Sequence, residues 1–271
     1  MTDDRPVDRV DEPVTPARIA ADLADLGVNP GETLLVHSSL SALGWVPGGP
    51  QGAVEGLRMA VGGKGTLVVP THSTDLTDPS DWENPPIPES WYETVRAETP
   101  PYRPDATPTR GMGAIPECLR DYDEAVRSAH PHYSFAALGA AAEPIVAGHN
   151  FAAALGEGSP LAAVYERDGA VLMLGCDLGR NTSLHLAEHR ADISHAYEPN
   201  GAPVLVDGER EYVTYDLLDM DDSDFADCSR AFAETHPESV TTGTVGAADA
   251  TLFDQPALVD FATEWLAQAR R

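Results

Sequence analysis

Short apolar runs alternate with amphipathic segments through the first third of the chain. Residues 32–37 and 65–70 are apolar runs of strand length, and residues 52–61 between them have the pattern of a helix. A strand, a helix and a second strand in this order predict a parallel strand pair whose connection crosses one face of a sheet. The loops after the two strands should therefore lie at the same edge of that sheet.

The same alternation continues toward the C-terminus and predicts one large α/β domain. The other expected strands are 133–138 and 170–174, with a hairpin of 203–206 and 211–215 around Asp207-Gly208. The other expected helices are 16–26, capped by Thr15, then 111–119, 182–191 and 256–269. We therefore predict a central, mostly parallel sheet flanked by helices over residues 15–271, after a flexible acidic tail at 1–14.

One long segment interrupts the regular pattern. Residues 75–109 are rich in proline and aspartate and contain Trp82 and Trp91. A connection of this length inside a domain is usually functional. We expect a Pro/Trp-rich insertion that shapes a binding site.

The charge balance is strongly acidic. The chain has 44 acidic residues against 17 basic ones, a formal charge of −27, and Lys64 as its single lysine. A surface of this sign excludes nucleic acid and anionic membranes as expected partners. It fits a polycationic substrate or a surface adapted to high salt, where screening removes self-repulsion. Because acidic residues are spread from Asp3 to Glu264, we favour a halophilic protein.

Cysteine usage and the lengths of apolar runs indicate the compartment. Cys118, Cys176 and Cys228 are too widely separated for a disulfide framework or a zinc knuckle. No apolar stretch approaches the length of a membrane span, and residues 1–12 are acidic, unlike a basic signal peptide. We expect a cytoplasmic protein without a membrane anchor. A homodimer is compatible with the sequence.

Three segments carry candidate binding residues. Residues 37–49 follow the first strand and are rich in serine and glycine, so backbone N–H groups could approach a phosphate there, although a plain strand-to-helix turn has the same composition. Residues 71–73 follow the second strand and could bind a ligand or cap the next turn. Arg110 and Arg127 suit either phosphate binding or pairing with a carboxylate.

The predicted helix 182–191 carries the strongest local signal. His185, Glu188, His189 and Asp192 lie on one face, because steps of three and four residues return to the same side. His185 and Glu188 could form a general base oriented by a carboxylate. Residues 185–189 also spell H-x-x-E-H, the inverted zinc-peptidase pattern, without an evident third ligand. The third interpretation is local pairing on a helix face, which contributes little stability.

Together these segments resemble the aminoglycoside N3-acetyltransferase family, which is distinct from the GNAT acetyltransferases. The resemblance extends from about Thr15 to Leu266 and rests on the motifs VHSSLSALG (36–44) with Gly48-Gly49, PTHS (70–73), RGMG (110–113), RSAHP (127–131), LGEGSP (155–160), TSLHLAE (182–188), LFD (252–254) and LVDF (258–261). It implies an α/β sandwich-like fold, acetyl-CoA as donor, and an amine of an aminoglycoside or related polyamine as acceptor.

The resemblance also implies roles for individual residues. His185 and Glu188 would form the catalytic pair, with no metal. The residues implied to lie along CoA are His37, Ser38, Ser39, Leu40, Ser41, Leu43, Gly44, Thr71, Ser73, Arg110, Gly111, Met112 and Gly113. Glu157 and Asp192, with the 75–109 segment, are candidates for an acidic acceptor pocket.

Amide formation sets the expected mechanism. An alkylammonium must lose a proton before it attacks the thioester, and His185 oriented by Glu188 could take it. Backbone N–H groups or the hydroxyl of Thr71 or Thr182 could stabilise the charge on the thioester oxygen. The alternatives are a zinc metallopeptidase and a CoA-binding protein without turnover.

Overall fold

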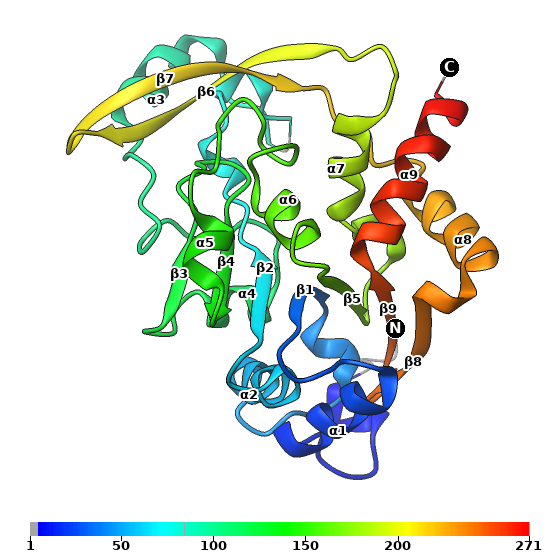
Figure 1. Ribbon diagram of the computed structural model, residues 1–271. Coiled ribbons are helices and arrows are strands. Elements are labelled where there is room, and N and C mark those ends of the chain that lie inside the picture. Colours follow the sequence, from blue (N-terminus) through cyan, green and yellow to red (C-terminus); the bar gives the residue numbers. More distant parts are fainter. Residues whose placement is uncertain (1–4, 84, 271) are drawn as a thin grey trace.

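The computed structural model describes residues 5–83 and 85–270, and a seven-stranded sheet runs through this part of the chain (Figure 1). The strand order is β3-β4-β2-β1-β5-β9-β8. The strands are β1 (Thr33–Ser38), β2 (Thr66–Pro70), β3 (Ala125–Arg127), β4 (Phe135–Gly139), β5 (Ala170–Leu174), β8 (Val240–Val245) and β9 (Ala248–Asp254).

The prediction of a mostly parallel sheet is confirmed. In the centre, β1 pairs in parallel with both β2 and β5. Toward the edges, β4 and β9 run antiparallel to their neighbours on both sides. Among the described residues, five of the seven strands therefore point in one direction, and the carboxyl ends of β1, β2 and β5 meet at one edge.

Helices cover both faces of the sheet, and the alternation of strand side chains divides the core between them. Leu34 and Val36 pack on one face, whereas Leu35 between them packs on the other. The first face is covered by α1 (Pro16–Leu26), α2 (Pro50–Val61) and α4 (Ala114–Leu119). The second is covered by α5 (Ala142–Val146), α6 (Pro160–Tyr165), α7 (Ser183–Arg190), α8 (Phe225–Thr235) and α9 (Gln255–Ala269).

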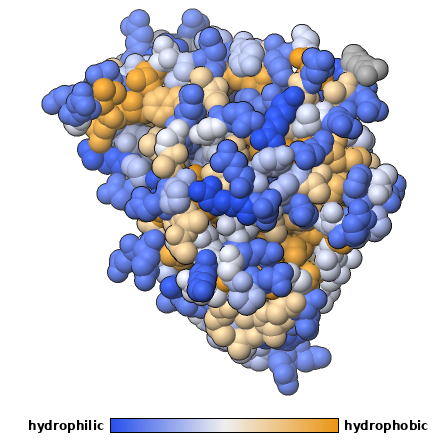
Figure 2. Space-filling view, in the orientation of Figure 1, coloured by the Kyte–Doolittle hydropathy of each residue, from blue (hydrophilic) through white to orange (hydrophobic). Residues whose placement is uncertain are grey.

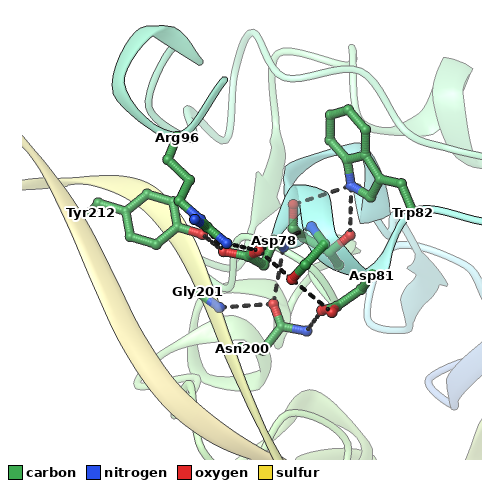
Figure 3. A network of polar contacts seen from close by, with 9 residues as sticks. Asp78, Asp81, Trp82, Arg96, Asn200, Gly201 and Tyr212 are labelled. Carbon is green, nitrogen blue, oxygen red and sulfur yellow. Dashed lines mark hydrogen bonds and ion pairs between the residues drawn. The ribbon is translucent and has the colours of Figure 1, made fainter. Parts of the chain in front are cut away.

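A two-stranded hairpin of β6 (Tyr197–Val206) and β7 (Glu209–Leu218) lies across one end of the molecule beside α3 (Tyr92–Glu98) of the insertion (Figure 1). Asp78 joins these two parts, because its carboxylate accepts hydrogen bonds from Arg96 at 2.7 and 2.8 Å and from the Tyr212 hydroxyl at 2.6 Å (Figure 3). The Arg96 guanidinium holds the pKa of Asp78 well below its usual range. The insertion and the hairpin are thus fastened to each other.

Several boundaries differ from the sequence prediction. Both hairpin strands are longer than expected, and the predicted strand 133–138 begins at Phe135. The predicted helix 111–119 begins only at Ala114, because Gly111 and Gly113 adopt positive φ angles of 71° and 91°, which a right-handed helix cannot contain. The hydrophobic pattern did not predict α3, α5, α6 or α8, the edge strands β3 and β8, or β9 between β5 and β8.

The segment before α1 is packed on the domain. Val14 is fully buried and its N–H donates to the carbonyl of Trp45 at 2.9 Å. Val10 packs so closely on Gly44 that a Cβ at that glycine would lie 2.8 Å from the valine side chain. The expected flexible acidic tail therefore does not extend to Val10 or Val14, and its residues 1–4 lie outside the described residues. Within the described ranges, no helix is long and apolar enough to cross a membrane.

Candidate active site

His185 and Glu188 meet on α7 at the carboxyl edge of the sheet. Nδ1 of His185 lies 2.8 Å from Oε2 of Glu188, as the i, i+3 spacing on a helix allows. Because Glu188 is ionised and can only accept, Nδ1 of His185 carries a proton and donates to it, and in the neutral imidazole the lone pair is then on Nε2. The Phe225 ring packs edge-on against the imidazole, with centroids 4.7 Å apart. The imidazole is therefore fixed in one orientation and one tautomer.

The second oxygen of Glu188 is also occupied. Oε1 accepts from the backbone N–H of Asp221 at 2.9 Å and from the Arg270 guanidinium at 2.5 Å. Burial by itself would raise the pKa of Glu188, but the hydrogen bonds from His185, Asp221 and Arg270 outweigh it and lower the pKa. Sequence analysis missed Arg270, which is 82 residues away along the chain.

A cavity of about 440 Å³ opens beside His185. Two further imidazoles line it, those of His37 at the end of β1 and His72 after β2. Burial lowers the pKa of His37 to about 4 and, with neighbouring histidines adding to the effect, that of His72 to about 3, so both are neutral at pH 7. Nε2 of His37 lies 3.2 Å from the Thr182 hydroxyl. We call this space the histidine cavity.

Unpaired polar atoms gather around the histidine cavity. In the part of the chain that the structure describes, six buried side-chain polar atoms have no hydrogen-bond partner. Three of them, Ser38 Oγ, His72 Nε2 and Asn181 Nδ2, belong to residues that line this cavity. Buried polar groups are usually satisfied, and exceptions cluster where a ligand completes the site.

A second cavity, of about 700 Å³, adjoins the first. The two share Ser38, Gly111 and Met112. Its other lining residues are Pro6, Ser39, Leu40, Ser41, Gly44, Trp45, Val46, Gly48, Gly49, Gly113 and Ala114. None of these described residues is charged, and the wall consists largely of small side chains and glycine backbone. We call it the glycine cavity.

Helix α2 begins at the edge of the glycine cavity. Gly49 is its N-cap, with a φ angle of 59° and no side chain to cap the first turn, and Pro50 follows. The N–H groups of a first helical turn have no partner inside the helix and favour anionic groups. The geometry suits a phosphate placed against backbone.

The residues predicted to lie along CoA do not all reach the glycine cavity. Ser38, Ser39, Leu40, Ser41, Gly44, Gly111, Met112 and Gly113 line the glycine cavity, His37 lines only the histidine cavity, and Leu43 is fully buried in the core. Thr71 and Ser73 turn inward instead: Thr71 contacts Ser134 and Arg127, and the Ser73 hydroxyl donates to the carbonyl of Pro131 at 2.7 Å. Arg110 pairs with Asp75 at 2.6 Å and lines neither cavity.

The two predicted acceptor carboxylates do not line either cavity. Glu157 is largely exposed and pairs with Arg190 at 2.7 Å, and Asp192 is exposed beyond the end of α7. Asp222, which sequence analysis did not single out, lines the histidine cavity instead. His189 packs against Gly156, and burial lowers its pKa to about 4. In the described ranges, no group of three or more His, Cys, Asp or Glu side chains is arranged to hold a metal ion.

An imidazole oriented by a buried carboxylate, in a cavity at the carboxyl edge of an α/β sheet, is the arrangement of an enzyme active site. Residues 35–267 match the family model described as aminoglycoside 3-N-acetyltransferase, and the chain belongs to this family. The sequence resemblance is thereby confirmed.

Curated relatives cover nearly the whole chain. It is 42% identical to an aminoglycoside N(3')-acetyltransferase-like protein, YokD, of Bacillus subtilis, over 93% of this chain and 92% of that protein. It is 38% identical to aminoglycoside N(3)-acetyltransferase VII of Streptomyces paromomycinus, over 95% of this chain and 93% of the relative.

Solved structures agree in fold. The crystal structure of YokD superposes with a TM-score of 0.94 at 39% identity, covering 98% of each chain. AAC-IIIb, solved with CoASH, gives a TM-score of 0.84 at 32% identity, covering 96% of this chain and 98% of that one. AAC-VIa, solved with sisomicin, gives 0.84 at 32% identity, covering 96% and 99%.

Proposed function

We propose that the protein transfers the acetyl group of acetyl-CoA to an amine of an aminoglycoside or related polyamine. The observation that carries the proposal is the contact between the two cavities at Ser38, Gly111 and Met112, with His185, which pairs with Glu188, lining one of them. Donor and acceptor can thus enter separate spaces and meet beside the imidazole. Membership of the family supports both the chemistry and the substrates.

Acetyl-CoA occupies the glycine cavity in this proposal. Its diphosphate lies against backbone N–H groups near Gly49 at the start of α2, where no charged side chain is needed. The adenine stacks on the Trp45 indole, which lines the cavity and is 47% exposed. The thioester then reaches the shared residues Ser38, Gly111 and Met112. AAC-IIIb bound to CoASH supports this choice of donor.

Proton transfer follows from the tautomer of His185. The acceptor ammonium first releases one proton to solvent, and the resulting amine attacks the thioester carbon while Nε2 of His185 takes a second proton from the same nitrogen. The C–S bond breaks as the amide forms, and the imidazolium returns this proton to the departing sulfur, giving CoASH. Glu188 stabilises the imidazolium in between. Thr182, which lines the cavity, remains a candidate donor to the thioester oxygen, whereas Thr71 is already engaged inside the fold.

The acceptor enters the histidine cavity. Asp222 supplies a carboxylate in its wall, and a neighbouring hollow contains Asp75, Asp81 and Glu83 of the insertion around Trp82. Arg110 belongs to this hollow and Gly111 to the histidine cavity, so the two are close along the wall. A polyamine can therefore present several ammonium groups to carboxylates. AAC-VIa bound to sisomicin supports an aminoglycoside as acceptor.

The test is CoASH release from acetyl-CoA in molar salt, with aminoglycosides and simple polyamines offered as acceptors. We expect release that depends on an aminoglycoside, with an acetylated product. CoASH release only with other amines would support acetyl transfer and show that the acceptor is not an aminoglycoside. CoA binding by calorimetry without release would indicate a binding protein and contradict the proposed transferase.

We also propose that the protein works in a salt-rich cytoplasm. Hydrophilic residues dominate the face seen in Figure 2, and the chain carries a formal charge of −27. The three cysteines, Cys118, Cys176 and Cys228, are unpaired, as a reducing compartment favours. Because salt screens repulsion between carboxylates, the urea midpoint of unfolding should rise from low to molar potassium chloride. A midpoint that stays constant or falls contradicts salt adaptation.

A further inference from the structure

Arg270 is the residue that links the catalytic carboxylate to a wall of the histidine cavity. It directly follows α9, and its side chain is 15% exposed. Its guanidinium donates to Glu188 at 2.5 Å, to the Asp224 carboxylate at 2.5 and 2.9 Å, and to the Asp221 carbonyl at 2.5 Å. Residues 221–225 also supply Asp222 and Phe225 to the cavity.

The negative net charge of the chain gives the positive charge of Arg270 a second role. A protein with a formal charge of −27 has a negative potential that favours protonated imidazole, whereas a general base must be neutral to accept a proton. The carboxylate of Glu188 adds to this effect at 2.8 Å from Nδ1 of His185. Arginine stays cationic at every pH of interest, so Arg270 opposes both contributions at close range.

Other ionisable groups line the histidine cavity or lie beside the catalytic pair and Arg270. They are Glu188 and His189 on α7, Asp221, Asp222 and Asp224 before α8, Arg180 before α7, His37 on β1, His72 after β2, Tyr133 before β4 and Cys176 after β5. Arg180 is the cation among these described residues, and Arg270 is a second cation beside them. Of the two, Arg270 makes a hydrogen bond to the catalytic carboxylate.

We propose that Arg270 is a positioning residue that keeps Glu188 ionised and directed at His185, and that its positive charge opposes the negative groups around the imidazole. The inference rests on the proposed role of His185 as general base. A purely structural role, in which Arg270 only anchors the start of α8 through Asp224, is the competing explanation.

The test compares variants that separate charge from anchoring. Arg270→Gln removes the charge and retains hydrogen-bonding groups, with Arg270→Met as a second neutral variant should the first fail to fold. Asp224→Asn weakens the anchor and leaves the charge of Arg270 in place. Arg230→Met is the matched control, because Arg230 is an exposed arginine on α8 that pairs with Asp227, outside the catalytic network. Arg270→Lys tests rescue by another cation.

Two measurements are made on each folded variant: the pH dependence of kcat/KM for transfer, and the NMR titration of ¹³C-labelled histidine, with His185 assigned by a His185→Gln variant. We expect the neutral variants to move the acidic limb and the His185 titration upward by about one pH unit or more. Arg270→Lys should stay closer to the wild type, and Asp224→Asn and Arg230→Met should not move either curve upward.

Unchanged curves in Arg270→Gln and Arg270→Met, or an equal upward shift in Asp224→Asn, would overturn the inference and leave Arg270 as an anchor. Absence of acetyl transfer in the wild type would instead contradict the proposed function. The NMR titration still reports on Arg270 in that case, so the two failures are distinguishable.

Discussion

The two adjoining cavities differ in how they are built. The glycine cavity is lined mainly by two continuous segments, 38–49 and 111–114, and among its described lining residues none carries a charge. The histidine cavity draws its wall from β1, the loop after β2, α7 and the segment before α8, and it is rich in ionisable groups. The first can recognise a ligand through backbone and shape, whereas the second depends on side chains brought together by the fold.

The largest expected effect separates chemistry from donor binding. His185→Ala removes the proposed base and should lower kcat for acetyl transfer by about 10²- to 10⁴-fold. Affinity for CoA, measured by calorimetry, should remain close to that of the wild type, because His185 does not line the glycine cavity. Comparable turnover in the variant would show that the histidine cavity does not supply the base.

Glu188→Gln should have a smaller effect on kcat than His185→Ala. The amide removes the negative charge and can donate from its NH₂ group to an unprotonated Nδ1 of His185, which favours the wrong tautomer but leaves the imidazole present. Steady-state kinetics of both variants at several pH values measure the difference. A loss in Glu188→Gln greater than that in His185→Ala would contradict a role limited to orientation and charge.

Trp45→Ala tests the other cavity. Loss of stacking on adenine should weaken acetyl-CoA binding by about 5- to 150-fold. Binding of S-acetylpantetheine, which lacks the adenosine, should not change. Trp91→Ala is the control, since Trp91 is also exposed but lies in the insertion, outside the cavity. Equal weakening of both donors would place adenine elsewhere.

The smallest expected effect per residue is a loss of folding stability at acidic pH. Burial lowers the pKa of His130 to about 2, with neighbouring histidines adding to the effect, and burial lowers the pKa of His132 and His149 to about 4. These folded-state values lie below the unfolded value of about 6.5, so the stabilisation is present above pH 6.5 and is lost as the pH falls below it. Each should cost about 1 kcal/mol of unfolding free energy by pH 5.5.

Urea unfolding at pH 7.5, 6.5 and 5.5, in constant molar salt, measures this loss. Hydrogen exchange at the same pH values locates it. We expect exchange to rise first in residues 128–154, which carry these histidines, and later in residues 38–49 of the glycine cavity. An equal rise of hydrogen exchange in residues 128–154 and 38–49 would contradict the expectation that the buried histidines cause the loss.

The sequence predicted the elements whose pattern is local. Hydrophobic periodicity within single elements predicted β1, α2 and β2 and the alternation of helices and strands. The three-residue spacing on a helix predicted the His185–Glu188 pair. The serine- and glycine-rich loop was also visible, because small residues in a strand-to-helix turn have a direct physical meaning. This loop forms most of the wall of the glycine cavity.

What the sequence could not predict depends on tertiary placement. Helix α7 ends at Arg190 and Ala191 is extended, with ψ of 140°, so Asp192 leaves the helical face on which it was expected. Thr71 and Ser73 are at the predicted edge but face inward, where Arg127 and the Pro131 carbonyl bind them. Arg270 pairs with Glu188 across 82 residues, and no local pattern indicates such a contact.

The Asp78 contacts have a consequence for exchanging parts between relatives. Asp78 and Arg96 belong to the insertion, and Tyr212 belongs to the hairpin, 134 residues from Asp78. The three side chains nevertheless form one hydrogen-bonded group (Figure 3). A chimera that receives the insertion of another family member but keeps this hairpin loses Asp78 and leaves the Tyr212 hydroxyl without this acceptor. We therefore expect a chimera that exchanges both segments to resist urea better than one that exchanges the insertion alone.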